Sequence, residues 1–115
     1  MKIALTVWDE RISPVFDSAH TFLIVDIKNE KIKKISYKSF DPQQEYRFAE
    51  DLNRLGVEVL ICGAISEVHS ILIEASSIHL IPFIGGNVNE IIGSYAKGNS
   101  LSPCFLMPGC RGNNV

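Results

Sequence analysis

The sequence predicts an α/β protein with three layers, α/β/α, built around a mixed five-strand sheet in the element order βββαβαβα. Two observations predict this class. Within residues 1–40, apolar residues form short β-rich runs that are separated by turn residues. After residue 41, apolar residues recur every three or four positions in segments that alternate with short apolar runs. This alternation is typical of helices that cross over between parallel strands.

The first half of the sequence predicts three strands, over residues 3–8, 21–27 and 31–40. Residues 9–19 are expected to form a loop, because the residue before a proline, here Ser13, disfavours helix. Asn29-Glu30 is the short polar turn of an antiparallel hairpin. Lysines alternate with apolar residues in the third strand, which is the pattern of a sheet edge with one face in water.

The second half predicts three helices and two strands. The first helix begins at Asp41-Pro42, carries Phe48, Leu52 and Leu55, and ends at Gly56. Residues 57–62 form a buried strand, and Ser66 caps a second helix. The apolar stripe of that helix is expected to consist of Val68, Ile71, Leu72 and Ala75.

Residues 79–83 form the last predicted strand, and Gly85-Gly86-Asn87 precedes a third helix over residues 88–97. Residues 99–115 show no periodicity. We therefore predict one domain over residues 1–98, followed by a C-terminal tail over residues 99–115 that is rich in proline, glycine and cysteine.

Composition excludes several classes of protein. The chain has 115 residues, of which 46% are apolar, and a formal net charge of −2, which excludes binding to nucleic acid through a strongly basic face. No signal segment or membrane-spanning run is present, so a cytoplasmic protein without membrane contact is expected. Three cysteines, an odd and small number, argue against a disulfide framework and favour metal or redox chemistry.

Ligands of open α/β sheets collect at the carboxyl ends of parallel strands, here residues 8–19, 62–64 and 83–87. Cys62 lies at one of these ends. It is predicted either as a soft metal ligand or reactive thiolate, with the Ser66 helix terminus lowering its pKa, or as a small buried apolar side chain. His20 flanks the same edge and is a second candidate ligand. His69, alone on a helix, is expected to be solvated or satisfied.

The turn Gly85-Gly86 offers backbone amides to an anion, or serves only as a turn and helix cap. No phosphate-binding glycine motif accompanies it, so no nucleotide is expected. Cys104 and Cys110 lie six residues apart in the tail, where they are expected to bind a soft metal or sulfide cluster, to act as a redox switch, or to have no role. No two-metal carboxylate set or nucleophile–base pairing is evident, so an enzyme is not expected.

Several segments resemble the dinitrogenase iron-molybdenum cofactor biosynthesis family, which includes NifX, NafY and the C-terminal domain of NifB. The resemblance rests on three runs, and it continues through Ile81-Pro82 to Gly98. The three runs are Met1-Lys2-Ile3-Ala4, Ser13-Pro14-Val15-Phe16-Asp17-Ser18-Ala19 leading into Phe22-Leu23-Ile24-Val25-Asp26, and Leu55-Gly56-Val57-Glu58-Val59-Leu60-Ile61-Cys62-Gly63-Ala64-Ile65.

The resemblance implies a ribonuclease-H-like fold and a non-enzymatic carrier or scaffold for an iron-molybdenum or other metal–sulfur cluster. It also implies partners among cofactor-assembly proteins, and the alternative of a regulatory module without a cluster that acts with a MinD-like ATPase. Many members have His-Phe-Gly where this chain has Val15-Phe16-Asp17. The implied cluster site is therefore Phe16, His20, Cys62, Gly63, Gly85 and Gly86, with His20, Cys62, Cys104 and Cys110 as the candidate metal ligands.

Overall fold

The computed structural model describes residues 1–39, 45–101 and 104–107. Its elements alternate as the sequence predicts, with one short strand added. In chain order they are β1 (Lys2–Trp8), β2 (Arg11–Ile12), a single 3₁₀ turn (Phe16–Ser18), β3 (Thr21–Lys28), β4 (Lys31–Ser39), α1 (Glu45–Arg54), β5 (Val57–Ile61), α2 (Glu67–Ala75), β6 (His79–Ile81) and α3 (Val88–Ala96). The predicted helix start at Asp41-Pro42 lies outside the described residues.

The sheet is mixed, with the strand order β4-β3-β1-β5-β6. β5 is parallel to β1 and β6 is parallel to β5, whereas β3 is antiparallel to both β1 and β4. The prediction of five strands was wrong by one, because β2 folds back onto the end of β1. The two residues of β2 are too few to give a periodic signal, and Asp9 makes the reversal with a φ of 56°.

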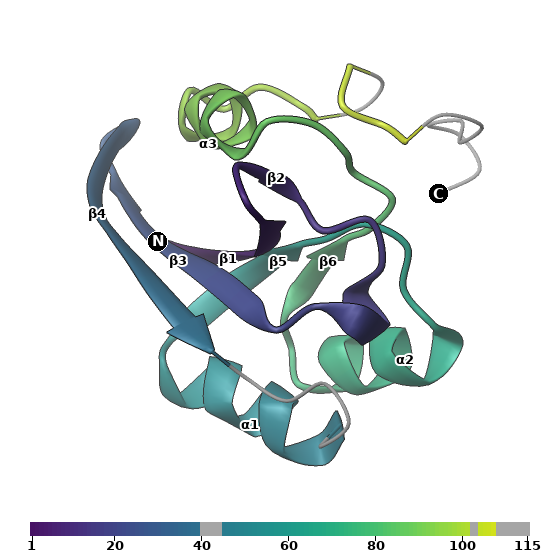
Figure 1. The fold of residues 1–115 in the computed structure, drawn as a ribbon. Helices are drawn as coiled ribbons and strands as arrows, with labels where there is room; N and C mark the ends of the chain where they lie inside the picture. The colour runs from purple at the N-terminus through teal and green to yellow at the C-terminus, as the bar shows by residue number, and fades with distance from the viewer. Residues whose placement is uncertain (40–44, 102–103, 108–115) are drawn as a thin grey trace.

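The helices cover both faces of the sheet, which confirms the three-layer prediction (Figure 1). α1 and α2 pack on one face and α3 packs on the other. Alternate residues of β1 divide between these layers, because successive side chains of a strand point to opposite faces. Ile3 and Leu5 lie in the core beneath α3, and Ala4 lies in the core beneath α1 and α2.

The apolar stripe predicted for α2 was wrong. Val68 is 55% exposed and Ile71 is 57% exposed, while His69 and Ile73 are buried. The helix is rotated because His69 packs inward, where its ring meets Phe16 edge-to-face with centroids 5.1 Å apart. A prediction that counts only apolar residues does not place a histidine on the buried face of a helix.

Part of the predicted tail packs against the domain. Leu101 is buried in the core beneath α3, and Phe105 and Leu106 pack against the same core. Residues 104–107 run antiparallel to residues 83–85, with the Phe105 carbonyl accepting from the Gly85 N–H at 2.8 Å. Residues beyond 98 therefore contribute to the folded core, although their sequence shows no periodicity.

Candidate functional site

The segments that follow β1, β5 and β6 lie side by side at the carboxyl edge of the sheet. The Phe16 N–H donates to the Ala64 carbonyl at 2.7 Å, and the Ala64 N–H donates to the Pro14 carbonyl at 2.9 Å. On the other side, the Phe83 N–H donates to the Gly63 carbonyl at 2.9 Å. These hydrogen bonds extend the sheet beyond its strands and join the three predicted ligand-binding segments into one surface.

Gly63 is required at the centre of this surface because the backbone of the preceding loop passes directly over it. A Cβ atom built on Gly63 would lie 2.5 Å from the carbonyl oxygens of both Ser13 and Pro14. Any side chain at position 63 would therefore displace the loop of residues 13–15. The role of Gly63 visible in this structure is to let two backbone segments approach closely.

A cavity of about 370 Å³ opens beside this loop. The end of β1, the loop of residues 13–15 and the entry to β3 enclose it. Its lining residues are Val7, Trp8, Ser13, Pro14, Val15, Ala19, His20 and Thr21. Trp8 is 67% exposed and Val15 is 43% exposed, so the cavity presents an apolar wall to solvent.

His20 lines this cavity and is exposed. Of the described residues that line it, His20 alone carries an imidazole, thiol or carboxylate. Imidazole is a common ligand for iron and other transition metals. The structure therefore brings one of the predicted ligands to an open, largely apolar cavity at the carboxyl edge.

Cys62 lies in the core beneath α1 and α2 and is fully buried. Burial, together with the nearby Asp17 carboxylate, raises the pKa of this thiol to about 12. The expectation that the α2 terminus would lower the pKa was wrong, because loss of hydration outweighs the helix dipole. At neutral pH Cys62 is a protonated thiol that packs as a small apolar side chain.

Sequence reasoning missed a polar cluster of Asp17, Ser66 and His69 next to this thiol. The Asp17 carboxylate accepts from the Ser66 N–H at 3.2 Å and lies 3.2 Å from His69 Nδ1. Ser66 Oγ lies 2.8 Å from the same ring nitrogen and accepts from the His69 N–H at 3.4 Å. The cluster fixes the 3₁₀ turn to the beginning of α2.

The local sequence held one signal for this cluster. Ser66 and His69 have the spacing of a capping box, in which the residue at the third helical position returns to the cap. Here Asp17, 49 positions earlier in the chain, supplies the carboxylate that receives the cap N–H. Phe16 is fully buried against His69. In this structure, Phe16 therefore supports the site from within the core.

Backbone amides on either side of Gly86 have partners within the protein. The Gly85 N–H donates to Phe105, and the Val88 N–H donates to the Glu10 carbonyl at 2.9 Å. The side chain of Asn87 accepts from the N–H groups of Asn89 and Glu90 in the first turn of α3. Of the two predicted roles, this arrangement matches the turn and helix cap.

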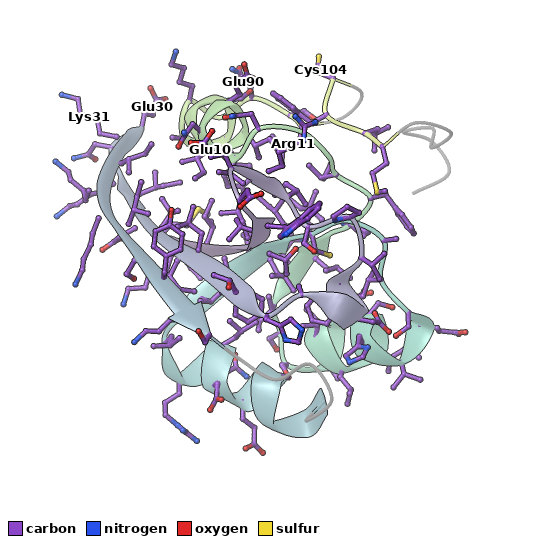
Figure 2. The ribbon with its side chains drawn as sticks, in the orientation of Figure 1. Glu10, Arg11, Glu30, Lys31, Glu90 and Cys104 are labelled. Atoms are coloured by element: carbon purple, nitrogen blue, oxygen red, sulfur yellow. The ribbon has the colours of Figure 1, made fainter. Side chains whose placement is uncertain are left out.

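The predicted cysteine pair falls only partly within the structure. Cys104 is exposed, and Figure 2 shows its side chain at the outer surface near α3. Cys110 lies outside the described residues. Within residues 1–39, 45–101 and 104–107, no group of three histidine, cysteine, aspartate or glutamate side chains is placed to hold a metal ion.

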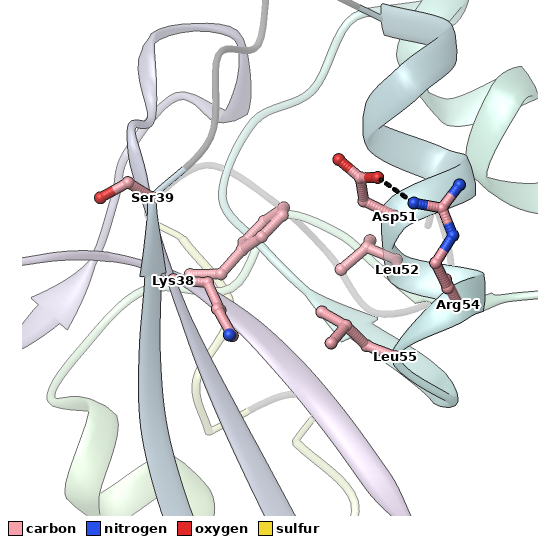
Figure 3. Close-up of a pocket in the computed structure, with 7 residues that line it drawn as sticks. Lys38, Ser39, Asp51, Leu52, Arg54 and Leu55 are labelled. Carbon is pink, nitrogen blue, oxygen red and sulfur yellow. Dashed lines mark hydrogen bonds and ion pairs between the residues drawn. The ribbon is translucent and has the colours of Figure 1, made fainter.

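A second cavity, of about 210 Å³, lies between β4 and α1 (Figure 3). Its lining residues are Phe22, Lys38, Ser39, Asp51, Leu52, Arg54 and Leu55. The carboxylate of Asp51 is paired with Arg54 at 3.4 Å, and the lining contains neither thiol nor imidazole. This cavity is therefore a poorer candidate for soft-metal chemistry than the one beside His20.

Comparison with known protein families shows which family the chain belongs to. The model of the family described as dinitrogenase iron-molybdenum cofactor matches residues 1–98. The chain belongs to this family. The match confirms the resemblance to this family that the sequence shows. It includes the loop of residues 13–20 and the strand end at Cys62. No protein with a curated description matches the chain significantly.

Solved structures share the fold of this dinitrogenase iron-molybdenum cofactor family member. The crystal structure of PH0822 superposes with a TM-score of 0.77 at 17% identity, covering 86% of this chain and 93% of that one. The crystal structure of MJ0327 from Methanocaldococcus jannaschii, described as a candidate dinitrogenase, gives 0.70 at 24% identity, with coverage of 85% and 89%. TM1290 from Thermotoga, described as a candidate NifB protein, gives 0.66 at 21%, with coverage of 84% and 88%.

These likenesses establish the α/β fold of the family member. The family itself is associated with the iron-molybdenum cofactor. None of the helices that the structure describes has both the length and the apolar composition of a membrane span.

Proposed function

We propose that this family member is a non-enzymatic carrier of a metal–sulfur cluster of the iron-molybdenum type, which it binds as cargo. Membership of the dinitrogenase iron-molybdenum cofactor family, over residues 1–98, is the observation that carries the proposal. Within this proposal the protein works in the cytoplasm, uses no nucleotide, and receives or delivers its cargo through cofactor-assembly proteins.

The cavity beside His20 is the proposed cargo site. Its volume of about 370 Å³ and its open position suit a ligand that must enter and leave without unfolding of the protein. His20 supplies one metal ligand, and the apolar wall formed by Trp8 and Val15 shields one side of the cluster from water. A small number of protein ligands suits a cargo, because a carrier must release what it binds.

The cysteines have different parts in this proposal. Cys104 is exposed, and the next residue, Phe105, accepts a hydrogen bond from Gly85 in the segment that follows β6, so Cys104 is the candidate second ligand, together with Cys110 of the tail. Cys62 is buried with its pKa raised to about 12, and it requires a local rearrangement before its sulfur can meet a metal. The proposal therefore ranks His20 and Cys104 above Cys62 as ligands.

Anaerobic reconstitution with iron, molybdate and sulfide tests the proposal, with visible absorption and metal analysis after desalting. The wild-type protein is expected to retain colour and metal, and His20→Ala to retain at most about a tenth as much, since loss of a ligand contact costs affinity by this order. His79→Ala is the matched control, because His79 is exposed at the start of β6. A wild-type protein that stays colourless and metal-free rules the carrier out.

The alternative function is a regulatory module that holds no cluster and acts with a MinD-like ATPase. Two points favour it: the family resemblance implies a histidine where this chain has Val15, and the described residues contain no ready three-ligand set. A pull-down with a MinD-like ATPase distinguishes the two functions. Binding of the ATPase by both the wild-type protein and His20→Ala, without retained metal, supports the module.

A further inference from the structure

β4 is the outermost strand of the sheet on the side away from β6 (Figure 1). It pairs with β3 from Lys31 to Ser39, and no other described residue pairs with it. In an antiparallel pair, alternate residues direct their backbone N–H and C=O groups away from the partner strand. The outer side of β4 therefore carries a row of donors and acceptors with the spacing that another strand requires.

The charge of β4 is opposite to that of the whole chain. The chain carries a formal net charge of −2, yet the nine residues of β4 contain four basic and no acidic side chains. Figure 2 shows Lys31 extending outward at the end of the hairpin. The four basic residues are Lys31, Lys33, Lys34 and Lys38. A positive strip thus borders an open strand edge.

The two faces of β4 differ in chemistry. Ile35 and Tyr37 are the partners of Val25 and Leu23, which belong to the core beneath α3. Ile35 is 45% exposed and Tyr37 is 69% exposed, so this face is apolar and open at the sheet edge. Lys38 is the partner of Phe22, which belongs to the core on the α1 side.

The surface beside Lys34 and Lys38 is hollowed. A groove of about 390 Å³ follows β3 and β4, and Lys38 and Leu55 line both this groove and the cavity shown in Figure 3. The lining residues of the groove are Lys2, Ile24, Asp26, Lys34, Ser36, Tyr37, Lys38 and Leu55. Three lysines and one carboxylate, that of Asp26, line this groove, so its charge is net positive and acidic side chains from an added strand would have space beside lysine ammonium groups.

We propose that the edge of β4 is a docking site for an extended, acidic segment of a partner protein, which adds to the sheet as one more strand. Main-chain hydrogen bonds hold the segment, acidic side chains face Lys34 and Lys38, and apolar side chains pack beside Ile35 and Tyr37. The inference concerns a different surface from the His20 cavity and does not depend on the carrier function.

Charge decides between the occupants of this edge. A second copy of the chain would bring four more lysines to this edge, with no acidic residue in either strand, and repulsion between like charges disfavours such a pairing. Nucleic acid matches the lysines, but it cannot pair with a row of peptide groups or use the apolar face. An acidic polypeptide segment can neutralise the lysines, pair with the backbone groups of β4 and pack against the apolar face.

Fluorescence anisotropy with a labelled peptide tests the proposal on the full chain. The probe has nine residues, the length of β4, with glutamate and valine alternating. We expect saturable binding that weakens as salt is added, and no binding of a matched peptide with lysine in place of glutamate. Lys34→Glu combined with Lys38→Glu is expected to weaken binding by about tenfold or more.

Arg11→Glu is the control variant, because Arg11 is exposed in β2, which pairs with β1 and not with β4. It is expected to leave peptide binding unchanged within about twofold. If the double charge reversal fails to fold, Lys34→Gln combined with Lys38→Gln replaces it. Amide chemical-shift changes on peptide binding are expected to concentrate in β4.

Three results would overturn the proposal. The acidic peptide binds no more tightly than the lysine peptide, the chemical-shift changes fall outside β4, or the wild-type chain forms a dimer that pairs through β4. Light scattering detects the last case, in which a second copy rather than an acidic partner occupies the edge.

Discussion

Replacing Gly63 with alanine tests how the carboxyl edge of the sheet is built. The new Cβ would lie 2.5 Å from two carbonyl oxygens and 2.8 Å from the Pro14 carbonyl carbon. All three are backbone atoms, so the clash is relieved only if the loop of residues 13–15 moves. Movement of this loop weakens the hydrogen bonds that join Ala64 to Pro14 and Phe16, at 2.9 and 2.7 Å.

The size of the effect follows from these contacts. Each lost hydrogen bond costs about 1 kcal/mol, and overpacking in a filled region costs about 1–3 kcal/mol. We expect Gly63→Ala to lower the free energy of unfolding by about 3 kcal/mol. Because Ser13, Pro14 and Val15 line the cavity beside His20, the same change is expected to reduce metal retention.

Urea unfolding measured by circular dichroism checks this magnitude, with Gly93→Ala as the matched control. Gly93 lies within α3, and a Cβ built there meets no atom within 4 Å. Alanine is therefore expected to stabilise the protein by about 0.5–1 kcal/mol at position 93. A Gly63→Ala variant as stable as wild type would refute the close approach of the two segments.

Three further predictions concern α2 and the groups around it. Ile73→Ala is expected to cost about 2–4 kcal/mol of unfolding free energy and Ile71→Ala less than about 0.5 kcal/mol, and equal losses in urea unfolding would contradict the observed rotation of the helix. Ser66→Ala and Asp17→Ala are each expected to cost about 1 kcal/mol, and their double variant less than the sum, since both side chains contact His69 Nδ1, at 2.8 and 3.2 Å. For Cys62, whose pKa is raised from 9.0 to about 12 in the folded state, unfolding releases the thiol proton above pH 9, so stability is expected to fall between pH 9 and pH 12. This fall should be shallower in Cys62→Ala by up to about 1.4 kcal/mol per pH unit, and parallel curves would contradict the burial of the thiol.

The order of the elements was predictable from the sequence because each main element carries its own period. The alternation before residue 40 and the helical spacing after it led to the correct order of the main strands and helices and to the correct layers. The helix caps were also predictable, because the side chains of Ser66 and Asn87 accept hydrogen bonds from N–H groups in the first turn of the helix that follows each of them. The two residues of β2 were missed because their pairing depends on the turn at Asp9, not on a repeated pattern.

The rotation of α2 and the polar cluster were not predictable from local pattern. His69 turns inward because it meets Asp17, which lies 52 positions away in the chain, and apolar counting instead favoured Val68 and Ile71. The raised pKa of Cys62 likewise depends on burial, which the sequence position at a strand end does not reveal.

The candidate site was predicted in part. The edge of the sheet and His20 follow from the rule that ligands collect at the carboxyl ends of parallel strands, and the structure places His20 at a cavity there. The partners of the Gly85 amide were not evident, because residue 105 lies in a segment without periodicity. Whether the cysteines of the tail bind metal stays a prediction, since Cys110 lies outside the described residues.

Metal retention after anaerobic reconstitution tests the central claim most directly, when wild type, His20→Ala and His79→Ala are compared in one experiment. The carrier proposal predicts a coloured wild-type protein that retains iron and molybdenum with sulfide, a His79→Ala variant that matches it, and a His20→Ala variant that loses most of the metal. Equal metal retention in all three proteins would contradict the assignment of the cargo to the His20 cavity, and a wild-type protein without metal would contradict the carrier function itself.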